Sequence, residues 1–229
     1  MSASTVNSNP EPATELELRF HHASSIRASP TLAESIRAFV NEGYSYMTAE
    51  RKLRWEYIYG ARLPSPETLF ETVGEDGMFA VLYHRIHQDD DEARREERWS
   101  EKPIACAATK RWKGDLENCR GDKGAEEEGW EILTVTTLPE YMRKGHAGTC
   151  IDALVEKLQT QAREGGCEKV TIWTQAVEEL NGRFWKNRGW VEEVRSYEQP
   201  VGHWGSRYGY RLLVLKRDFV LGEMQSGRD

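Results

Sequence analysis

The sequence predicts a mixed α+β fold in which a mostly antiparallel sheet of about seven strands is flanked by helices. Two observations lead to this expectation. Seven short segments carry the apolar patterns that are typical of β-strands, and amphipathic helical segments separate several of them. Between residues 130 and 174, a strand, a glycine turn, a helix and a second strand follow one another. This is the order of a βαβ unit, whose two strands are parallel neighbours.

The N-terminal half begins with residues 1–14, which are rich in Ser, Asn, Pro and Thr and are expected to form a disordered tail. Proline fits the first turn of a helix. We therefore expect one helix to run from Pro30 to Val40 and another to begin at Pro66. Three strands are expected in this half because their apolar residues alternate or run continuously: 16–20, 78–83 and 104–109.

Two polar segments separate expected strands. Residues 88–102 carry a long run of charged side chains, and residues 113–129 are polar and contain glycine. Because strands flank both segments, we expect loop excursions within a single domain, residues 15–217. Their length exceeds what a compact hairpin needs, so we expect them to be disordered or functional. Residues 218–229 are expected to form a C-terminal tail.

The C-terminal half has the most regular pattern. Residues 130–137 are expected to form a strand, and residues 145–164 a helix whose apolar residues recur at helical spacing. Gly165 and Gly166 are expected to end that helix. The remaining expected elements are the strand 170–174, the helix 181–188 and the closing strands 190–197 and 208–216.

The composition excludes several classes of protein. The 229 residues carry a formal net charge of −7, which argues against a general nucleic-acid binder and mildly favours a cationic substrate. The four cysteines form no CxxC pair, so we expect reduced thiols and no metal site. No apolar run approaches the length of a membrane span, and the N-terminus does not resemble a signal peptide. The sequence therefore favours a cytoplasmic protein without membrane contact.

The turn before the long helix has the features of a phosphate site. Arg143, Lys144 and Gly145 lie where the helix begins, and a helix N-terminus presents unpaired N–H groups and partial positive charge. Glycine allows a ligand to approach the backbone closely. Two cations beside such a turn suggest a diphosphate. The segment therefore indicates a nucleotide-like, phosphate-bearing cofactor and an enzyme.

Two motifs resemble those of the GNAT acyltransferase superfamily. Residues 142–147, Met-Arg-Lys-Gly-His-Ala, resemble its [Gln/Arg]-x-x-Gly-x-[Gly/Ala] signature, with Met142 where Gln or Arg is usual. Pro139-Glu140-Tyr141 before the turn is also similar to the family. Residues 181–190, Asn-Gly-Arg-Phe-Trp-Lys-Asn-Arg-Gly-Trp, resemble the helix that follows the second βαβ strand in the family. The resemblance implies the GNAT fold, acetyl-CoA (coenzyme A) as the cofactor and acyl transfer as the reaction.

The resemblance also implies where the cofactor lies. Acetyl-CoA is expected between the strands 130–137 and 170–174, with its pantetheine arm along the first strand and its pyrophosphate at the turn. The residues assigned to coenzyme A in this way are Val135, Thr136, Thr137, Met142, Arg143, Lys144, Gly145, His146, Ala147, Gly148, Thr149, Asn181, Trp185 and Lys186.

Acetyl transfer to an amine needs a base and a hydrogen-bond donor for the oxyanion. Glu131 is the candidate base, because many GNAT relatives carry a carboxylate at this place on the strand. The alternative is a strand glutamate that faces solvent. Strand parity does not decide between the two, since relatives often carry a bulge here and a bulge reverses the faces. A backbone N–H of residues 135–137 is the expected oxyanion donor.

The departing thiolate can also take a proton from an acid. The usual tyrosine of the family corresponds to Trp185, whose indole N–H donates a hydrogen bond but supplies no proton near neutral pH. Either the thiolate leaves unassisted, or Tyr197, Tyr208 or Tyr210 substitutes. The alternative for each tyrosine is a packing role on a closing strand.

The expected function is acetyl-CoA-dependent transfer of an acetyl group to a primary amine of a small molecule, by direct attack in a ternary complex. We expect a monomer or homodimer. Two alternatives stay open: a protein or peptide N-acetyltransferase whose acidic loops recognise a basic peptide, and a catalytically silent acyl-CoA-binding protein.

An aromatic cluster after the first helix either lines the acceptor pocket or packs in a second helix: Tyr44, Tyr46, Trp55, Tyr57 and Tyr59.

Overall fold

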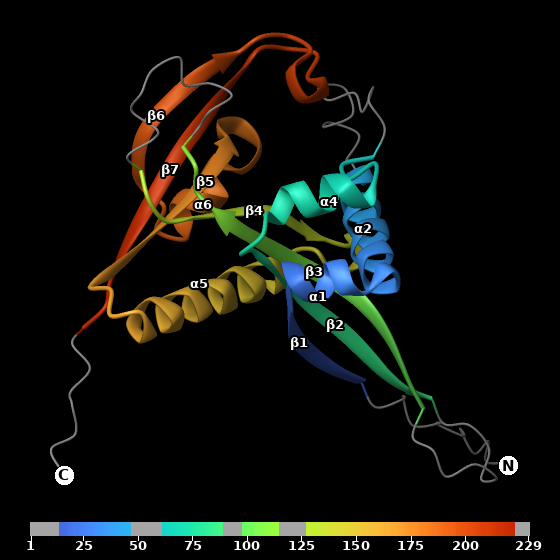
Figure 1. The fold of residues 1–229 in the computed structure, drawn as a ribbon. Helices are drawn as coiled ribbons and strands as arrows, with labels where there is room; N and C mark the ends of the chain where they lie inside the picture. Colours follow the sequence, from blue (N-terminus) through green and yellow to red (C-terminus); the bar gives the residue numbers. More distant parts are fainter. Residues whose placement is uncertain (1–13, 47–60, 89–97, 115–126, 223–229) are drawn as a thin grey trace, which may run out of the picture.

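The computed structural model describes residues 14–46, 61–88, 98–114 and 127–222. One seven-stranded sheet, in the order β1-β2-β3-β4-β5-β7-β6, runs through this part of the molecule (Figure 1). Neighbouring strands are antiparallel except for β4 and β5, which are parallel. The predicted mixed α+β fold with a mostly antiparallel sheet of seven strands is confirmed.

The described strands are β1 (Thr14–His22), β2 (Met78–Gln88), β3 (Arg98–Arg111), β4 (Trp130–Thr137), β5 (Lys169–Val177), β6 (Glu192–Gln199) and β7 (Tyr210–Val220). The α-helices are α1 (Ala23–Ala28), α2 (Pro30–Ser45), α4 (Pro66–Val73), α5 (His146–Glu164) and α6 (Arg183–Asn187). A 3₁₀ turn, η2 (Pro139–Tyr141), precedes α5, and a π-helical turn, η3 (Glu178–Gly182), leads into α6.

Helices α2 and α4 begin at Pro30 and Pro66, as the sequence predicted, and a serine side chain caps each of them. The hydroxyl of Ser29 accepts a hydrogen bond from the backbone N–H of Leu32, and the hydroxyl of Ser65 accepts one from Thr68, both at 3.3 Å. These bonds satisfy helix N–H groups that otherwise have no partner within the helix. The six-residue helix α1 was not predicted, because it buries only Ala23 and Ile26 and is too short to show a helical period.

Helices cover both faces of the sheet (Figure 1). On one face α1, α2 and α4 enclose a core in which Phe39 of α2 and Leu69 of α4 pack with Phe79 of β2. On the other face α5 encloses a second core, where its Leu154 packs with Ile172 of β5. The long helix therefore lies across the parallel strand pair, as a βαβ unit requires.

The predicted βαβ unit, β4–α5–β5, is confirmed. α5 ends at Glu164, and the backbone N–H of Gly165 donates to the carbonyl of Gln161 at 3.0 Å. Gly166 then has φ of 72°, a left-handed conformation that glycine adopts without a Cβ clash. The glycine pair thus ends the helix and turns the chain toward β5.

The first predicted loop and both predicted tails have different bounds in the structure. Residues 98–102, expected in a loop, belong to β3, and β2 extends to Gln88. Residues 218–220, expected in the C-terminal tail, belong to β7, and Thr14, expected in the N-terminal tail, begins β1. The central parts of the two polar segments, residues 89–97 and 115–126, lie outside the described residues.

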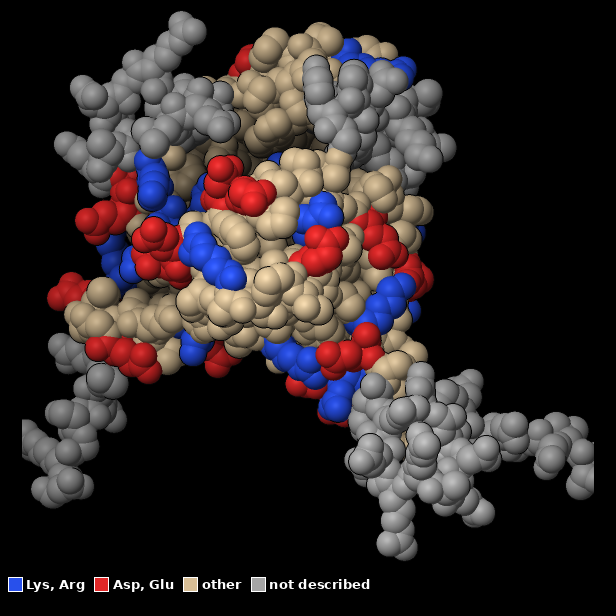
Figure 2. Space-filling view, turned by 45° about the vertical axis from the view of Figure 1, so that its right-hand side comes forward, with Lys and Arg blue, Asp and Glu red and all other residues tan. Residues whose placement is uncertain are grey.

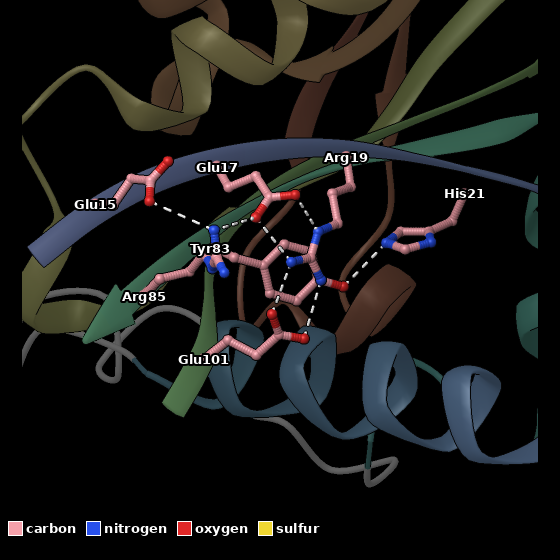
Figure 3. Close-up of polar contacts among 7 residues, drawn as sticks. All are labelled: Glu15, Glu17, Arg19, His21, Tyr83, Arg85 and Glu101. Atoms are coloured by element: carbon pink, nitrogen blue, oxygen red, sulfur yellow. Dashed lines mark hydrogen bonds and ion pairs between the residues drawn. The ribbon is translucent and has the colours of Figure 1, made fainter. Parts of the chain in front are cut away.

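A network of ion pairs explains why charged residues form strands here (Figure 3). The guanidinium of Arg19 on β1 donates to the carboxylate of Glu17 and, at 2.8 and 2.9 Å, to both oxygens of Glu101 on β3. The same guanidinium lies 4.8 Å from the ring centre of Tyr83, whose hydroxyl is 2.9 Å from Nε2 of His21. Polar side chains of three neighbouring strands thus pair with one another, and these pairs stabilise the sheet beyond the apolar residues at its centre.

Charges of both signs are interspersed on the face shown in Figure 2, without a large area of one sign. Such an alternating surface has no extended basic patch on this face. Among the helices of the described ranges, none is both long and apolar enough to cross a membrane.

Candidate active site

β4 and β5 lie side by side only where they begin. Their parallel pairing consists of Trp130 opposite Ile172 and Glu131 opposite Trp173. Beyond these pairs β5 continues alongside β7, and β4 continues alongside β3. We call this the β4–β5 divergence. In the described part of the chain, the remainder of β4 therefore has no strand paired on the side of β5.

A bulge in β4 accompanies the β4–β5 divergence. The register of β3 and β4 shifts between Cys106 and Ala108, so that β4 has one extra residue there. Thr134 within the bulge has φ of 50°, which is strained for a residue with a Cβ. Leu133 packs with the core on the α2 side, whereas Val135, two residues later, packs with the core on the α5 side. The bulge thus reverses the faces, as the resemblance implied.

Glu131 lies where β4 and β5 begin to diverge, before the bulge. It is only 5% exposed. Its Oε2 is 3.3 Å from Nζ of Lys110 on β3, and its Oε1 accepts a hydrogen bond of 3.2 Å from Nε2 of Gln175 on β5. The alternative of a strand glutamate that faces solvent is therefore wrong. Partners on both oxygens hold this buried carboxylate in a defined orientation.

The predicted phosphate turn lies at the other end of β4. Gly145 is the N-cap of α5 with φ of 87°, and Arg143 is also left-handed with φ of 64°. A Cβ built on Gly145 would meet nothing within 4 Å, so the backbone faces open space. Met142, Arg143 and Lys144 are exposed. The turn thus presents the free end of a 19-residue helix and two cationic side chains to the surface.

Side chains from η2 and β2 support this turn. The hydroxyl of Tyr141 is 2.7 Å from Nδ1 of His84, and its ring lies 5.3 Å from Nζ of Lys144. The ring of Tyr141 also contacts that of His146 at 6.2 Å between centres. Burial, together with the charges of Lys144 and His84, lowers the pKa of His146. His84 and Tyr141 are 57 residues apart, so no local sequence pattern indicates this contact.

The second motif contacts the helix α5 just after the first motif. Arg188, at the end of α6, donates a hydrogen bond of 3.0 Å to the carbonyl of Gly148 in the first turn of α5, and it also pairs with Asp152. A Cβ on Gly148 would lie 2.4 Å from Nη1 of Arg188. Glycine is therefore needed at this position for the guanidinium to reach the helix backbone.

The second motif divides into buried and exposed residues. Trp185 is buried, with its ring 5.2 Å from that of Trp190 in an edge-on arrangement. Asn181 and Lys186 are exposed, and Lys186 lies 3.8 Å from Glu178. The side chain of Trp185 is thus part of the core beneath α6, while the other two side chains are accessible to a ligand.

The candidate tyrosines have different surroundings. Tyr197 of β6 packs against the cluster of Trp112, Trp173 and Val214, and Trp173 is the residue opposite Glu131. Tyr208 lies between β6 and β7 and is 60% exposed. Tyr210 is buried beside His203, and burial raises the pKa of its hydroxyl above that of a free phenol. Of the three, the described packing links only Tyr197 to the surroundings of Glu131.

The remaining candidates lie in the core or outside the described residues. Cys150 is buried in the core on the α5 side, and burial raises the pKa of its thiol to about 12. In the aromatic cluster, Tyr44 lies beneath the guanidinium of Arg62. Tyr46 is exposed, and residues 47–60, which include the other members, are not described. The described residues contain no group of three or more His, Cys, Asp or Glu that could hold a metal ion.

Comparison with known proteins identifies the fold. No family model and no curated sequence matches this chain. Among solved structures, an acetyltransferase of the GNAT family from Streptococcus pneumoniae matches with a TM-score of 0.52 at 11% identity, covering 91% of this chain and 100% of that one. The ribosomal-protein-S18-alanine N-acetyltransferase from Escherichia coli matches with a TM-score of 0.48 at 11% identity, covering 94% and 100%. Arabidopsis thaliana NAA60 in complex with acetyl-CoA matches with a TM-score of 0.46 at 13% identity, covering 89% of this chain and 98% of that one.

The strand order, the β4–β5 divergence, the bulge and the glycine turn therefore define the fold of a GNAT acetyltransferase. The sequence prediction of this fold is confirmed. At these levels of identity the likeness concerns the fold alone.

Proposed function

We propose that this protein is an acetyl-CoA-dependent N-acetyltransferase that acetylates a primary amine of a small molecule. The main support is the combination of a buried carboxylate, Glu131, where β4 and β5 begin to diverge and an open helix N-terminus at the far end of β4. A cofactor with a diphosphate at one end and a reactive thioester at the other would connect these two features.

The turn would hold the cofactor by its diphosphate. Backbone N–H groups of residues 142–149 would donate to the phosphate oxygens, and Arg143 and Lys144 would add charge. The free edge of β4 would pair with the amides of the pantetheine arm through Val135, Thr136 and Thr137, as another strand would. Asn181 and Lys186, which are exposed on the second motif, would contact the far side of the cofactor, and Trp185 would support them from below.

Glu131 would act as the base. Its carboxylate would take a proton from the acceptor's ammonium, through a water molecule where needed, and free the lone pair that attacks the thioester carbon. The N–C bond forms and the C–S bond breaks within one ternary complex, without a covalent enzyme intermediate. A backbone N–H of residues 135–137 would stabilise the oxyanion. Tyr197 or Tyr208 would protonate the thiolate of coenzyme A, or the thiolate would leave unassisted.

Two measurements test this proposal. Isothermal calorimetry should show acetyl-CoA binding to the full chain, and the absence of binding would contradict the cofactor assignment. A screen for free coenzyme A thiol over primary amines, polyamines, arylamines, amino acids and basic peptides should then identify an acceptor among the small amines. Turnover confined to the peptides would make the protein a peptide N-acetyltransferase. Binding without turnover across the panel would make it a silent acyl-CoA binder.

A further inference from the structure

The two strands beside β4 each place one polar group at the carboxylate of Glu131. β3 provides Nζ of Lys110, 3.3 Å from Oε2, and β5 provides Nε2 of Gln175, 3.2 Å from Oε1. Lys110 and Glu131 are direct cross-strand partners, so the backbone itself fixes this pair. The two donors differ in one respect, since Lys110 is charged and Gln175 is neutral.

The two members of the pair differ in exposure. The carboxylate side chain of Glu131 is 6% exposed, whereas the side chain of Lys110 is 37% exposed. A carboxylate that leaves water loses hydration, which favours its neutral form, and a nearby cation opposes this effect. Lys110 therefore supplies what a buried base needs to stay ionised, while its own ammonium remains partly hydrated.

Two other charged groups on the elements around β4, Arg111 and Glu42, have different partners. Arg111 of β3 lies over the ring of Trp130, 4.1 Å from its centre, and Trp130 belongs to the core on the α5 side. From β5, Trp173 and Gln175 contribute no charge. On α2, Glu42 interacts with Lys102. α5 packs on the opposite face of the sheet. In the described ranges, Lys110 is a cation within ion-pair distance of Glu131.

We infer that Lys110 is a positioning residue for the base: it holds Glu131 ionised in the free enzyme, and Gln175 fixes the orientation of the carboxylate. This inference rests on the proposed function. This role of Lys110 would affect the pH dependence of kcat/KM, which a purely structural ion pair would not do. The acid limb of the pH profile of kcat/KM reports ionisation of the base in the free enzyme, and the charge of Lys110 sets where that limb falls.

Lys110→Met tests this inference. Without the cation, a higher pH is needed to ionise Glu131, so the acid limb of kcat/KM should move up by roughly one pH unit. Lys110→Arg keeps the charge and should leave the limb within a few tenths of a pH unit of its original position. Gln175→Leu removes a neutral donor and should lower kcat with little movement of the limb. Lys110→Gln provides a second neutral variant if Lys110→Met does not fold.

A matched control separates loss of this charge from loss of any strand lysine. Lys169 of β5 also faces a carboxylate, Asp218, at 4.0 Å, but its side chain is 64% exposed and lies outside the proposed site. Lys169→Met should leave the pH profile unchanged. An unmoved acid limb in both neutral Lys110 variants, with turnover retained, would overturn the inference but leave the proposed function intact. Absence of turnover in the unmodified protein would instead overturn the proposed function.

Discussion

The guanidinium of Arg188 donates a hydrogen bond to the carbonyl oxygen of Gly148, and this contact joins the end of α6 to the first turn of α5. The two segments are 40 residues apart in sequence, and each contributes one of the motifs by which the chain resembles GNAT enzymes. The contact couples the proposed phosphate turn to the exposed residues of the second motif.

Gly148→Ala should disturb this coupling. The new Cβ would lie 2.4 Å from Nη1 of Arg188, so the guanidinium must shift, and the shift should weaken its bond to the helix carbonyl. We expect a loss of about 1.5 kcal/mol in the free energy of unfolding, which is typical of a hydrogen bond to a charged group, together with weaker acetyl-CoA binding. Chemical denaturation and calorimetry measure the two effects.

Arg188→Met is the control for this prediction. It removes the guanidinium, so adding Gly148→Ala to it should cost much less than the same change costs alone. If the two substitutions were fully additive, contact between Gly148 and Arg188 would not be the cause.

Gly43→Ala should destabilise the protein although alanine is the better helix former. Gly43 is buried in α2, and a Cβ there would lie 2.4 Å from Oγ1 of Thr136 on β4. Overpacking of this kind typically costs about 1–3 kcal/mol, and the displacement would fall on the strand segment proposed to bind pantetheine.

The double variant Gly43→Ala, Thr136→Ala tests the cause. With the threonine hydroxyl and methyl removed, Gly43→Ala should become neutral or stabilising by up to about 1 kcal/mol, because helix propensity then dominates. Thermal and denaturant unfolding of the unmodified protein, the two single variants and the double variant show whether Gly43→Ala stabilises or destabilises each background. A cost that is unchanged in the Thr136→Ala background would rule out the proposed clash.

His21 should make stability depend on pH. Burial, and then the charge of Arg19, lower the pKa of this imidazole below its ordinary value of 6.5. Below about pH 6.5 the unfolded chain therefore binds a proton that the folded chain resists, and the free energy of unfolding should fall as the pH decreases. Denaturation curves between pH 8 and pH 5 should show this fall.

His21→Asn should remove the part of this decrease in the free energy of unfolding that protonation of His21 causes. Two-dimensional NMR of the imidazole resonances gives an independent reading, since His21 should titrate below pH 6.5. A His21 resonance that titrates above that value would contradict the prediction.

The sequence predicted best what depends on local pattern. The β4–α5–β5 unit, the glycine end of α5 and the proline starts of α2 and α4 follow from residues that are neighbours in the chain. The glycine turn could be identified for the same reason. Its left-handed residues and the helix start lie within a few positions of one another.

What the sequence did not predict depends on contacts between distant segments. Residues 98–102 appeared too charged for a strand, yet Glu101 of β3 is paired with Arg19, 82 residues away. Glu131 could be proposed as a base, but its partners Lys110 and Gln175 come from two other strands and have no local signal. The burial of Trp185 likewise follows from packing against Trp190 and not from the motif.

The most direct test of the account compares the unmodified protein with Glu131→Gln in single-turnover release of coenzyme A thiol, at saturating acetyl-CoA and with the best amine of the panel. We expect release by the unmodified protein and release at least about 100-fold slower by the variant, as general-base catalysis implies, with unchanged acetyl-CoA affinity by calorimetry. Equal release rates for the two proteins would contradict the role of Glu131 as the base.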